Sequence, residues 1–324
     1  SKSAYKPLAR LSGLLALALL AGGLAVLVLD LGHPDRLIVA MTYYNFKSIF
    51  AWNIYLYTGF FVIVIIYLWM MMERKMNHFT KSAGTAAFIW RLALTTGTGS
   101  IFGFIVARQL YDSAIYAPLF IIMSFSFGLA IFILVLMATY AGTGRPLGDA
   151  ILFRLKNLLG VFIAAVLLMV TIFYLTDLYG TEHHDAVAFI LNGDNIYTKL
   201  FWVVQIIMGS LAPLALLYNP VTGTSRAWIA IASILVIIGG MAQLYVILIG
   251  GQAFPLILFP GMEISSSFAD GVVASYSPSL PEFLLGLGGV AIALIIVTLA
   301  MKVLQFVPNS LADADVDPHY KAAS

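Results

Sequence analysis

Ionisable side chains gather in a short segment near the start of the chain, directly after an apolar run. The segment holds Asp30, His33, Asp35 and Arg36, with Pro34 among them. A histidine can both accept and donate a proton, and Asp30 can orient that imidazole or relay its proton. Arg36 can instead hold Asp30 in a bidentate ion pair, which would make the segment a rigid turn at a helix end. The two roles are compatible.

Other side chains able to bind a ligand or move protons lie further along the chain. Tyr43 and Tyr44 follow the turn, and either hydroxyl can donate a hydrogen bond to a ligand carbonyl. Tyr174 and Asp177 are three residues apart, which places them on one helix face. We interpret Tyr174 as an interfacial anchor and Asp177 as a candidate for proton handling and catalysis.

A third group of polar side chains forms a seam through an otherwise apolar run. Its members are Arg91, Thr95, Thr96, Thr98 and Ser100, which occupy two adjoining faces of a helix. The seam can serve as a proton pathway. Alternatively, its hydroxyls bond back to carbonyls one turn earlier and Arg91 extends to the membrane surface. Gly99 and Gly103, in the same run, predict close approach of another helix.

Two polar patterns favour structural roles. Gln205 and Gln243 lie inside apolar runs, where we expect them to hydrogen-bond neighbouring helices. The segment 182–185 contains two histidines between acidic residues, but adjacent histidines in a loop are more often solvated than metal-bound. We therefore predict no metal site.

The elements that position these side chains must be membrane helices. Hydrophobic residues make up 61% of the 324 residues and charged residues only 10%, and the mean hydropathy is +0.98. Soluble domains carry about 25% charged residues, so the composition predicts an all-α integral membrane protein. About eight apolar runs have the ~20 residues needed for a crossing: 9–29, 48–72, 85–111, 116–140, 158–178, 198–218, 227–250 and 282–306.

Cysteine is absent, which excludes disulfides and thiolate-bound iron–sulfur clusters within this chain. All five histidines fall in loops or the tail, so we expect no intrinsic haem. Nothing resembles a phosphate-binding loop, a dinucleotide motif or a nucleic-acid-binding pattern. A redox centre would have to be a quinone or lie in a partner protein.

Orientation follows from the 17 Lys and Arg residues. Thirteen fall on the side that holds the N-terminus: Lys2, Lys6, Arg10, Arg74, Lys75, Lys81, Arg91, Arg145, Arg154, Lys156, Arg226, Lys302 and Lys321. Only Arg36, Lys47, Arg108 and Lys199 fall on the other. Because cytoplasmic loops are enriched in Lys and Arg, both termini are predicted in the cytoplasm. The loops 30–47, 112–115, 179–197 and 251–281 then face outward, where a redox partner would dock.

The spans suggest two four-helix bundles. We expect the first, with the site, in residues 1–140 and the second in 158–307, joined by a basic cytoplasmic loop at 141–157. The polar residues 308–324 would form a solvated cytoplasmic tail.

A family resemblance covers most of the chain. The sequence Asp30-Leu31-Gly32-His33-Pro34-Asp35-Arg36 resembles the Asp-Leu-Gly-Arg-Pro-x-Arg signature of the NrfD/PsrC family, with His33 in place of the more usual Arg. Segments 45–53, 95–103 and 277–282 are also similar to family segments, and the best match is to the DsrP/HybB branch. In that family the signature usually follows the second or third span, whereas here it follows the first. One or two upstream helices are therefore expected to be absent.

The resemblance implies a subunit that has no cofactor of its own. This subunit would bind quinone, either ubiquinone or menaquinone, as its substrate. It also implies a four-cluster ferredoxin-like iron–sulfur partner on the outer face, together with catalytic and other membrane subunits, in the inner membrane of a prokaryote. We expect the quinone near His33, Arg36, Tyr43 and Tyr44. Two alternatives are a transporter or ion channel with an acidic outer vestibule, and a purely structural anchor.

Overall fold

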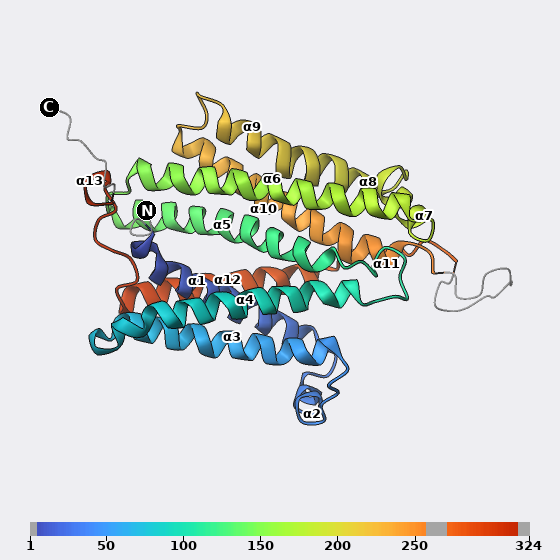
Figure 1. The fold of residues 1–324 in the computed structure, drawn as a ribbon, viewed down its shortest axis with the longest axis horizontal. Helices are drawn as coiled ribbons and strands as arrows, with labels where there is room; N and C mark the ends of the chain where they lie inside the picture. Colours follow the sequence, from blue (N-terminus) through green and yellow to red (C-terminus); the bar gives the residue numbers. More distant parts are fainter. Residues whose placement is uncertain (1–4, 257–270, 317–324) are drawn as a thin grey trace. The chain divides into compact units, whose positions relative to one another are not determined.

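The computed structural model describes residues 5–256 and 271–316, and this part of the chain is helical (Figure 1). Its α-helices are α1 (Ala9–Asp30), α2 (Leu37–Thr42), α3 (Ile49–Met72), α4 (Thr80–Gly103), α5 (Tyr116–Thr143), α6 (Asp149–Tyr179), α7 (His184–Leu191), α8 (Ile196–Lys199), α9 (Ala212–Tyr218), α10 (Arg226–Tyr245), α11 (Gly251–Ala253), α12 (Leu280–Val303) and α13 (Asp313–Val316). Short 3-10 turns are η1 (Lys6–Leu8), η2 (Pro34–Arg36) and η3 (Arg74–Phe79), and the π-helical segments are η4 (Leu200–Leu211) and η5 (Val246–Gly250). Within these ranges there is no strand, only an isolated bridge between Leu147 and Leu311.

The all-helical membrane architecture predicted from composition is confirmed. Within the described ranges, seven helical segments are long and apolar enough to cross a bilayer. The remaining predicted span corresponds to α4, which has 24 residues but is more polar because it carries the seam. Part of the predicted outer loop 251–281 lies outside the described residues, as do Lys2 and Lys321.

Helix α4 ends at Gly103, eight residues earlier than the predicted span. The chain then folds back, since the amide of Asp112, at φ 58°, donates to the carbonyl of Phe102. A Cβ at Gly103 would stand 2.8 Å from the carbonyl oxygen of Ser113, and one at Gly99 would stand 2.6 Å from that of Tyr116. The two glycines therefore allow the start of α5 to approach closely, as their spacing predicted.

Helix α6 begins at Asp149, nine residues before the predicted span, and the C-terminal segment explains why. The Asp313 carboxylate accepts hydrogen bonds from the backbone amides of Asp149 and Ala150, at 3.3 and 2.9 Å, and so caps the helix. Leu311 is buried beside it. Within the predicted solvated tail, Leu311 and Asp313 thus contact the start of α6 and satisfy two of its backbone donors, whereas Asn309 and Asp315 are exposed.

The chain forms two compact units. The first contains the described residues of Ser1–Thr98, Tyr140–Ile151 and Pro278–Ser324, and the second those of Gly99–Thr139 and Leu152–Ser277. This division differs from the predicted bundles, because the last span, α12, joins α1 in the first unit. Helix α12 begins with a capping box, in which Ser279 and Glu282 bond reciprocally to each other's backbone amide.

Small residues bring α1 and α12 together. Ala18 and Gly22 in α1, and Gly289 and Ala293 in α12, are all buried. A Cβ added at Gly22 would stand only 2.3 Å from the carbonyl oxygen of Gly289. This spacing of small residues, four apart on each helix, is a common device for packing helices in lipid.

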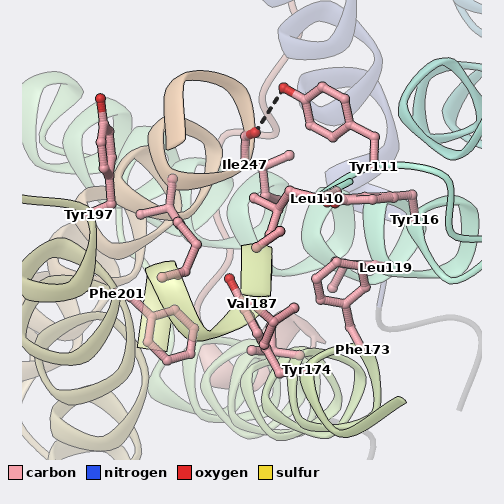
Figure 2. Packing of buried hydrophobic residues seen from close by; sticks show 14 of the residues in the cluster. Leu110, Tyr111, Tyr116, Leu119, Phe173, Tyr174, Val187, Tyr197, Phe201 and Ile247 are labelled. Atoms are coloured by element: carbon pink, nitrogen blue, oxygen red, sulfur yellow. Dashed lines mark hydrogen bonds between the residues drawn. The ribbon is translucent and has the colours of Figure 1, made fainter. Parts of the chain in front are cut away.

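The second unit has an aromatic core (Figure 2). Tyr116, Phe173, Tyr174 and Phe201 pack there with α7, whose residue Val187 is fully buried. The predicted outer loop 179–197 therefore contains a helix that belongs to the core. A second glycine contact lies between η4 and α10, where a Cβ at Gly209 would stand 2.4 Å from the Cα of Gly239.

Candidate functional site

The signature turn connects α1 to α2 at one end of the first unit. Helix α1 ends at Asp30, and Pro34 opens the 3-10 turn η2, in which the Arg36 amide donates to the His33 carbonyl at 3.1 Å. The ring Nδ1 of His33 lies 3.9 Å from Oδ1 of Asp35, and these side chains are 67% and 77% exposed. Asp35, which sequence reasoning did not select, is therefore the acidic neighbour of His33.

The other ionisable residues of the turn stand apart. Asp30 and Arg36 are both exposed, and the described residues include no ion pair between them. The expected bidentate pair is consequently not formed in this structure. Helix α2, which follows, projects from the ends of α1 and α3 (Figure 1) and exposes Ile38, Val39 and Met41.

The two predicted tyrosine donors have different surroundings. Tyr43 is 84% exposed. Tyr44 is half-buried, and its hydroxyl donates to the carbonyl of Ala51 in α3. The Tyr44 ring packs at 4.3 Å between centroids against Tyr55. Tyr43 thus keeps its hydroxyl available, whereas the Tyr44 hydroxyl is already engaged.

Aromatic side chains line the start of α3 beside the turn. Phe46 contacts both Tyr44 and Trp52, at 5.1 and 6.1 Å between ring centroids. The indole Nε1 of Trp52 donates to the Phe46 carbonyl at 2.8 Å, which fixes the ring in place. These flat apolar faces are suited to hold a planar ring.

A buried polar cluster lies beside these aromatics, between α3 and α4. Asn53 is buried in α3, and its amide donates to the Ile49 carbonyl at 3.0 Å. The Thr98 hydroxyl in α4 lies 3.4 Å from the Asn53 Oδ1 and 3.3 Å from the Tyr57 hydroxyl. Gly97 leaves room for the amide, since a Cβ there would stand 3.2 Å from Oδ1. Sequence reasoning missed Asn53, although an amide inside an apolar run is the signal that identifies it.

The rest of the α4 seam fits the packing interpretation. The hydroxyls of Thr95 and Thr98 donate to carbonyls four residues earlier, at 2.9 and 3.0 Å. The Arg91 guanidinium lies 5.6 Å from the centroid of the Phe60 ring, a cation–π contact. Thr96 is exposed and Ser100 half-buried. A proton pathway through these residues stays a prediction.

Asp177 is a buried carboxylate of the second unit. It is 4% exposed, and its Oδ2 has no hydrogen-bond partner among the described residues. It interacts electrostatically with Tyr116, Tyr174 and His183. A carboxylate left with an unpaired oxygen is costly to bury, which favours a role beyond packing.

The histidines beside Asp177 are held by backbone carbonyls. His183 Nδ1 is hydrogen-bonded to the Gln109 carbonyl at 2.6 Å, and His184 Nδ1 to that of Leu178 at 2.9 Å. In the part of the chain that the structure describes, no three His, Cys, Asp or Glu side chains are grouped as metal ligands.

Gln205 and Gln243 surround a small polar cavity in the second unit. Both are buried, and neither the Gln205 Oε1 nor the Gln243 Nε2 has a partner within the described ranges. The cavity of about 10 Å³ also touches Ser126 and Ser210, and it approaches the size needed for one water molecule. The expected helix-to-helix hydrogen bonds of these two atoms are therefore not formed.

The π-helical segment η5 (Val246–Gly250) accepts hydrogen bonds from a tyrosine in the loop between α4 and α5. In η5 the carbonyls of Ile247 and Leu248 accept from the Tyr111 hydroxyl, at 3.0 and 2.9 Å; Figure 2 shows the Ile247 bond. Burial raises the pKa of Tyr111 above its ordinary value, so this loop hydroxyl stays a donor. Wide turns of this kind often occur at functional sites.

Comparison with known proteins gives consistent matches. The family model described as "Polysulphide reductase, NrfD" matches residues 1–256. The Hdr-like menaquinol oxidoreductase integral membrane subunit of Archaeoglobus fulgidus is 31% identical over 321 residues, covering 97% of this chain and 79% of that protein. A selenate reductase subunit of Mesobacillus selenatarsenatis is 24% identical, covering 87% and 74%. A putative dimethyl sulfoxide reductase membrane subunit of Halobacterium salinarum is 25% identical, covering 96% and 77%.

Proposed function

Because the chain belongs to the NrfD family, we propose that it is the quinone-reactive membrane subunit of an oxidoreductase complex. The observation that carries this proposal is the match, over almost the whole chain, to a protein named as an integral membrane subunit of a menaquinol oxidoreductase. Two further relatives are named as subunits of selenate and dimethyl sulfoxide reductases. All three relatives are named as subunits of a reductase or an oxidoreductase, and the substrates in their names differ.

The proposed quinone site is the end of the first unit that contains the turn. The aromatic side chains of Trp52 and Tyr55 offer faces for the quinone ring, and the exposed Tyr43 offers a donor. Asn53, the residue after Trp52 in α3, donates one amide hydrogen to Ile49, and its second amide hydrogen offers a donor to a quinone carbonyl. The two donors beside these aromatic faces, Tyr43 and Asn53, match the two carbonyls of a quinone.

The proposed chemistry is a balanced transfer of electrons and protons. Oxidation of a quinol releases two electrons and two protons, and reduction of a quinone takes up the same number. We assign proton transfer at one quinol oxygen to His33, with Asp35 at 3.9 Å stabilising the charged imidazole. The electrons pass to a redox centre in a partner, since a chain without cysteine cannot bind a cluster through thiolates.

A partner protein has a suitable surface beside the turn. Ile38, Tyr43, Phe46 and Phe50 are each more than 60% exposed. Exposed apolar side chains grouped in this way are typical of protein interfaces. We propose that a ferredoxin-like iron–sulfur subunit docks here on the outer face, in an assembly that contains further catalytic and membrane subunits in a prokaryotic inner membrane.

The most direct test is to identify the proteins that copurify with the chain. We expect a tagged chain, extracted in mild detergent, to bring down a cysteine-rich cluster protein and to give quinone-dependent electron transfer in that complex. A chain that purifies alone and transports a solute when reconstituted alone would contradict the proposal and favour a transporter. A complex whose quinone reaction persists without this chain would favour a structural anchor.

Proton coupling can be tested separately at Asp177 and Arg91. If Asp177 and the α4 seam carry protons, Asp177→Asn and Arg91→Leu lower the number of protons moved per electron in proteoliposomes while electron transfer continues. Asp177→Asn should also raise the thermal unfolding midpoint, because it removes a buried carboxylate with an unpaired oxygen. The matched control is Asp194→Asn, at a fully exposed acid. Unchanged coupling in both variants would leave the seam with a packing role only.

A further inference from the structure

A large cavity of the first unit lies at the end opposite the signature turn, where α1 begins and α3 ends. Its volume is about 1040 Å³, and its walls come from η1, the last turns of α3, the first turns of α4 and the segment after α12. The orientation predicted from Lys and Arg places this end in the cytoplasmic leaflet. The cavity is therefore separate from the proposed quinone site, and its role does not depend on that proposal.

The charged side chains that line the cavity are all basic. They are Lys6, Arg10 and Lys81, and none of the described residues that line it is acidic. Neither lysine side chain has a hydrogen-bond or ion-pair partner among the described residues. Three cations around one hollow, without an acid to balance them, favour an anionic ligand.

Arg10 is held firmly at the wall. One terminal nitrogen donates to the Met71 carbonyl at 2.8 Å and the other to the Gln305 carbonyl at 3.4 Å. Met71 lies in the last turn of α3, and Gln305 closely follows α12, so the guanidinium binds carbonyls at two helix ends. A guanidinium has five N–H donors, so the donors of Arg10 that do not bond these two carbonyls can bind a ligand.

The cavity is polar at its rim and apolar further in. Asn77 and Thr80 lie with Lys81 at the end of the cavity where α3 ends and α4 begins, whereas Tyr67 and Phe88 lie further from that end along these helices. Phe88 is seven residues after Lys81 in α4, which corresponds to a depth of roughly 10 Å at the rise of an α-helix. A ligand that fills this space needs a charged group at one end and an apolar body at the other.

We propose that this cavity binds an anionic phospholipid, with the headgroup phosphate among Lys6, Arg10 and Lys81 and an acyl chain along Phe88 and Tyr67. A neutral quinone would leave three cations unpaired, and a soluble anion would leave the apolar walls unfilled. Basic pockets between membrane helices on the cytoplasmic side bind lipid headgroups in the same manner. The bound lipid would join the ends of α1, α3 and α4.

The test measures lipid binding to the full chain, purified in detergent and stripped of lipid, by native mass spectrometry. The probes are phosphatidylglycerol, phosphatidylcholine and inorganic phosphate. Lys6→Gln combined with Lys81→Gln removes two rim charges but keeps Arg10 and its helix contacts. The matched control, Lys75→Gln with Lys302→Gln, removes the same charge from exposed lysines that do not line the cavity.

We expect phosphatidylglycerol to bind more tightly than phosphatidylcholine, and millimolar phosphate not to displace it. Each cavity lysine should contribute about fivefold, so the double variant should weaken phosphatidylglycerol binding by about 25-fold. The control should change it less than twofold. Equal binding by both double variants, or equal binding of the two lipids, would overturn the proposal. Displacement by phosphate alone would show a soluble-anion site instead. Unfolding midpoints measured without lipid confirm that each variant is folded.

Discussion

Gly22→Ala lowers the thermal unfolding midpoint of the protein, whereas Gly23→Ala, the same change one residue later in α1, does not. A Cβ at Gly22 would stand 2.3 Å from the carbonyl oxygen of Gly289, but one at Gly23 would meet no atom within 4 Å. Because the obstructing atom belongs to the backbone of α12, it cannot rotate away. One of the two helices has to move.

The two substitutions should therefore have effects of opposite sign. Forcing an extra methyl group into a packed contact typically costs about 1–3 kcal/mol, whereas alanine in place of glycine at an open helical position stabilises by up to about 1 kcal/mol. We expect the midpoint of Gly22→Ala to fall by roughly 2–8 °C, and that of Gly23→Ala to stay constant or rise slightly.

The same contrast can be repeated on α12. A Cβ at Gly289 would stand 2.5 Å from the Val26 Cγ2, while Gly288 has open space around it. The measurement is intrinsic fluorescence during heating in detergent, since the chain has five tryptophans. Similar midpoints for the two variants of each pair would mean that α1 and α12 do not cross at these glycines.

The second large effect is expected at His33. In the intact complex, His33→Ala should lower kcat/KM for the quinone substrate by about 100-fold or more, because a positioned acid or base typically contributes about 10²–10⁴-fold to a rate. Asp35→Asn should lower it by a smaller factor, since Asp35 acts only through the imidazole 3.9 Å away. The measurement is steady-state electron transfer with a soluble quinol analogue.

Two controls separate proton transfer from assembly. His78→Ala makes the same change at an exposed histidine beyond the far end of α3 and should leave the rate unaltered. Each variant complex is also checked for bound partner subunits by gel filtration. Normal turnover in His33→Ala and Asp30→Asn, combined with loss of assembly in Arg36→Ala, would instead identify the turn as a structural anchor.

Local sequence features were enough for the membrane class and most span boundaries. An apolar run of about 20 residues has few alternatives to a helix that crosses the bilayer, because lipid offers no partner for free backbone groups. The two boundaries that moved furthest, at Gly103 and Asp149, both depend on contacts with other segments. The amide of Asp112 bonds back near the end of α4, and Asp313 caps α6.

The site shows the same limit. The position of the turn and the types of its side chains are read directly from residues 30–36. The residues alone do not show which acid lies beside His33. That acid is Asp35, because the backbone between His33 and Arg36 forms a 3-10 turn that brings Asp35 toward the imidazole ring. The amide of Asn53 stands out within an apolar run, but only the fold brings Thr98, 45 residues away, beside it.

The sequence by itself determined that this is a multi-pass helical protein of the NrfD family with an ionisable turn after its first span. The tertiary structure alone decided that α12 joins α1 in the first unit, and that Gly22 is a contact while Gly23 is not. The physical reason is that lipid and protein neighbours are both apolar. A membrane helix is therefore apolar on every side, and its hydrophobic pattern does not reveal which face packs. Only the close approach of backbones distinguishes those faces.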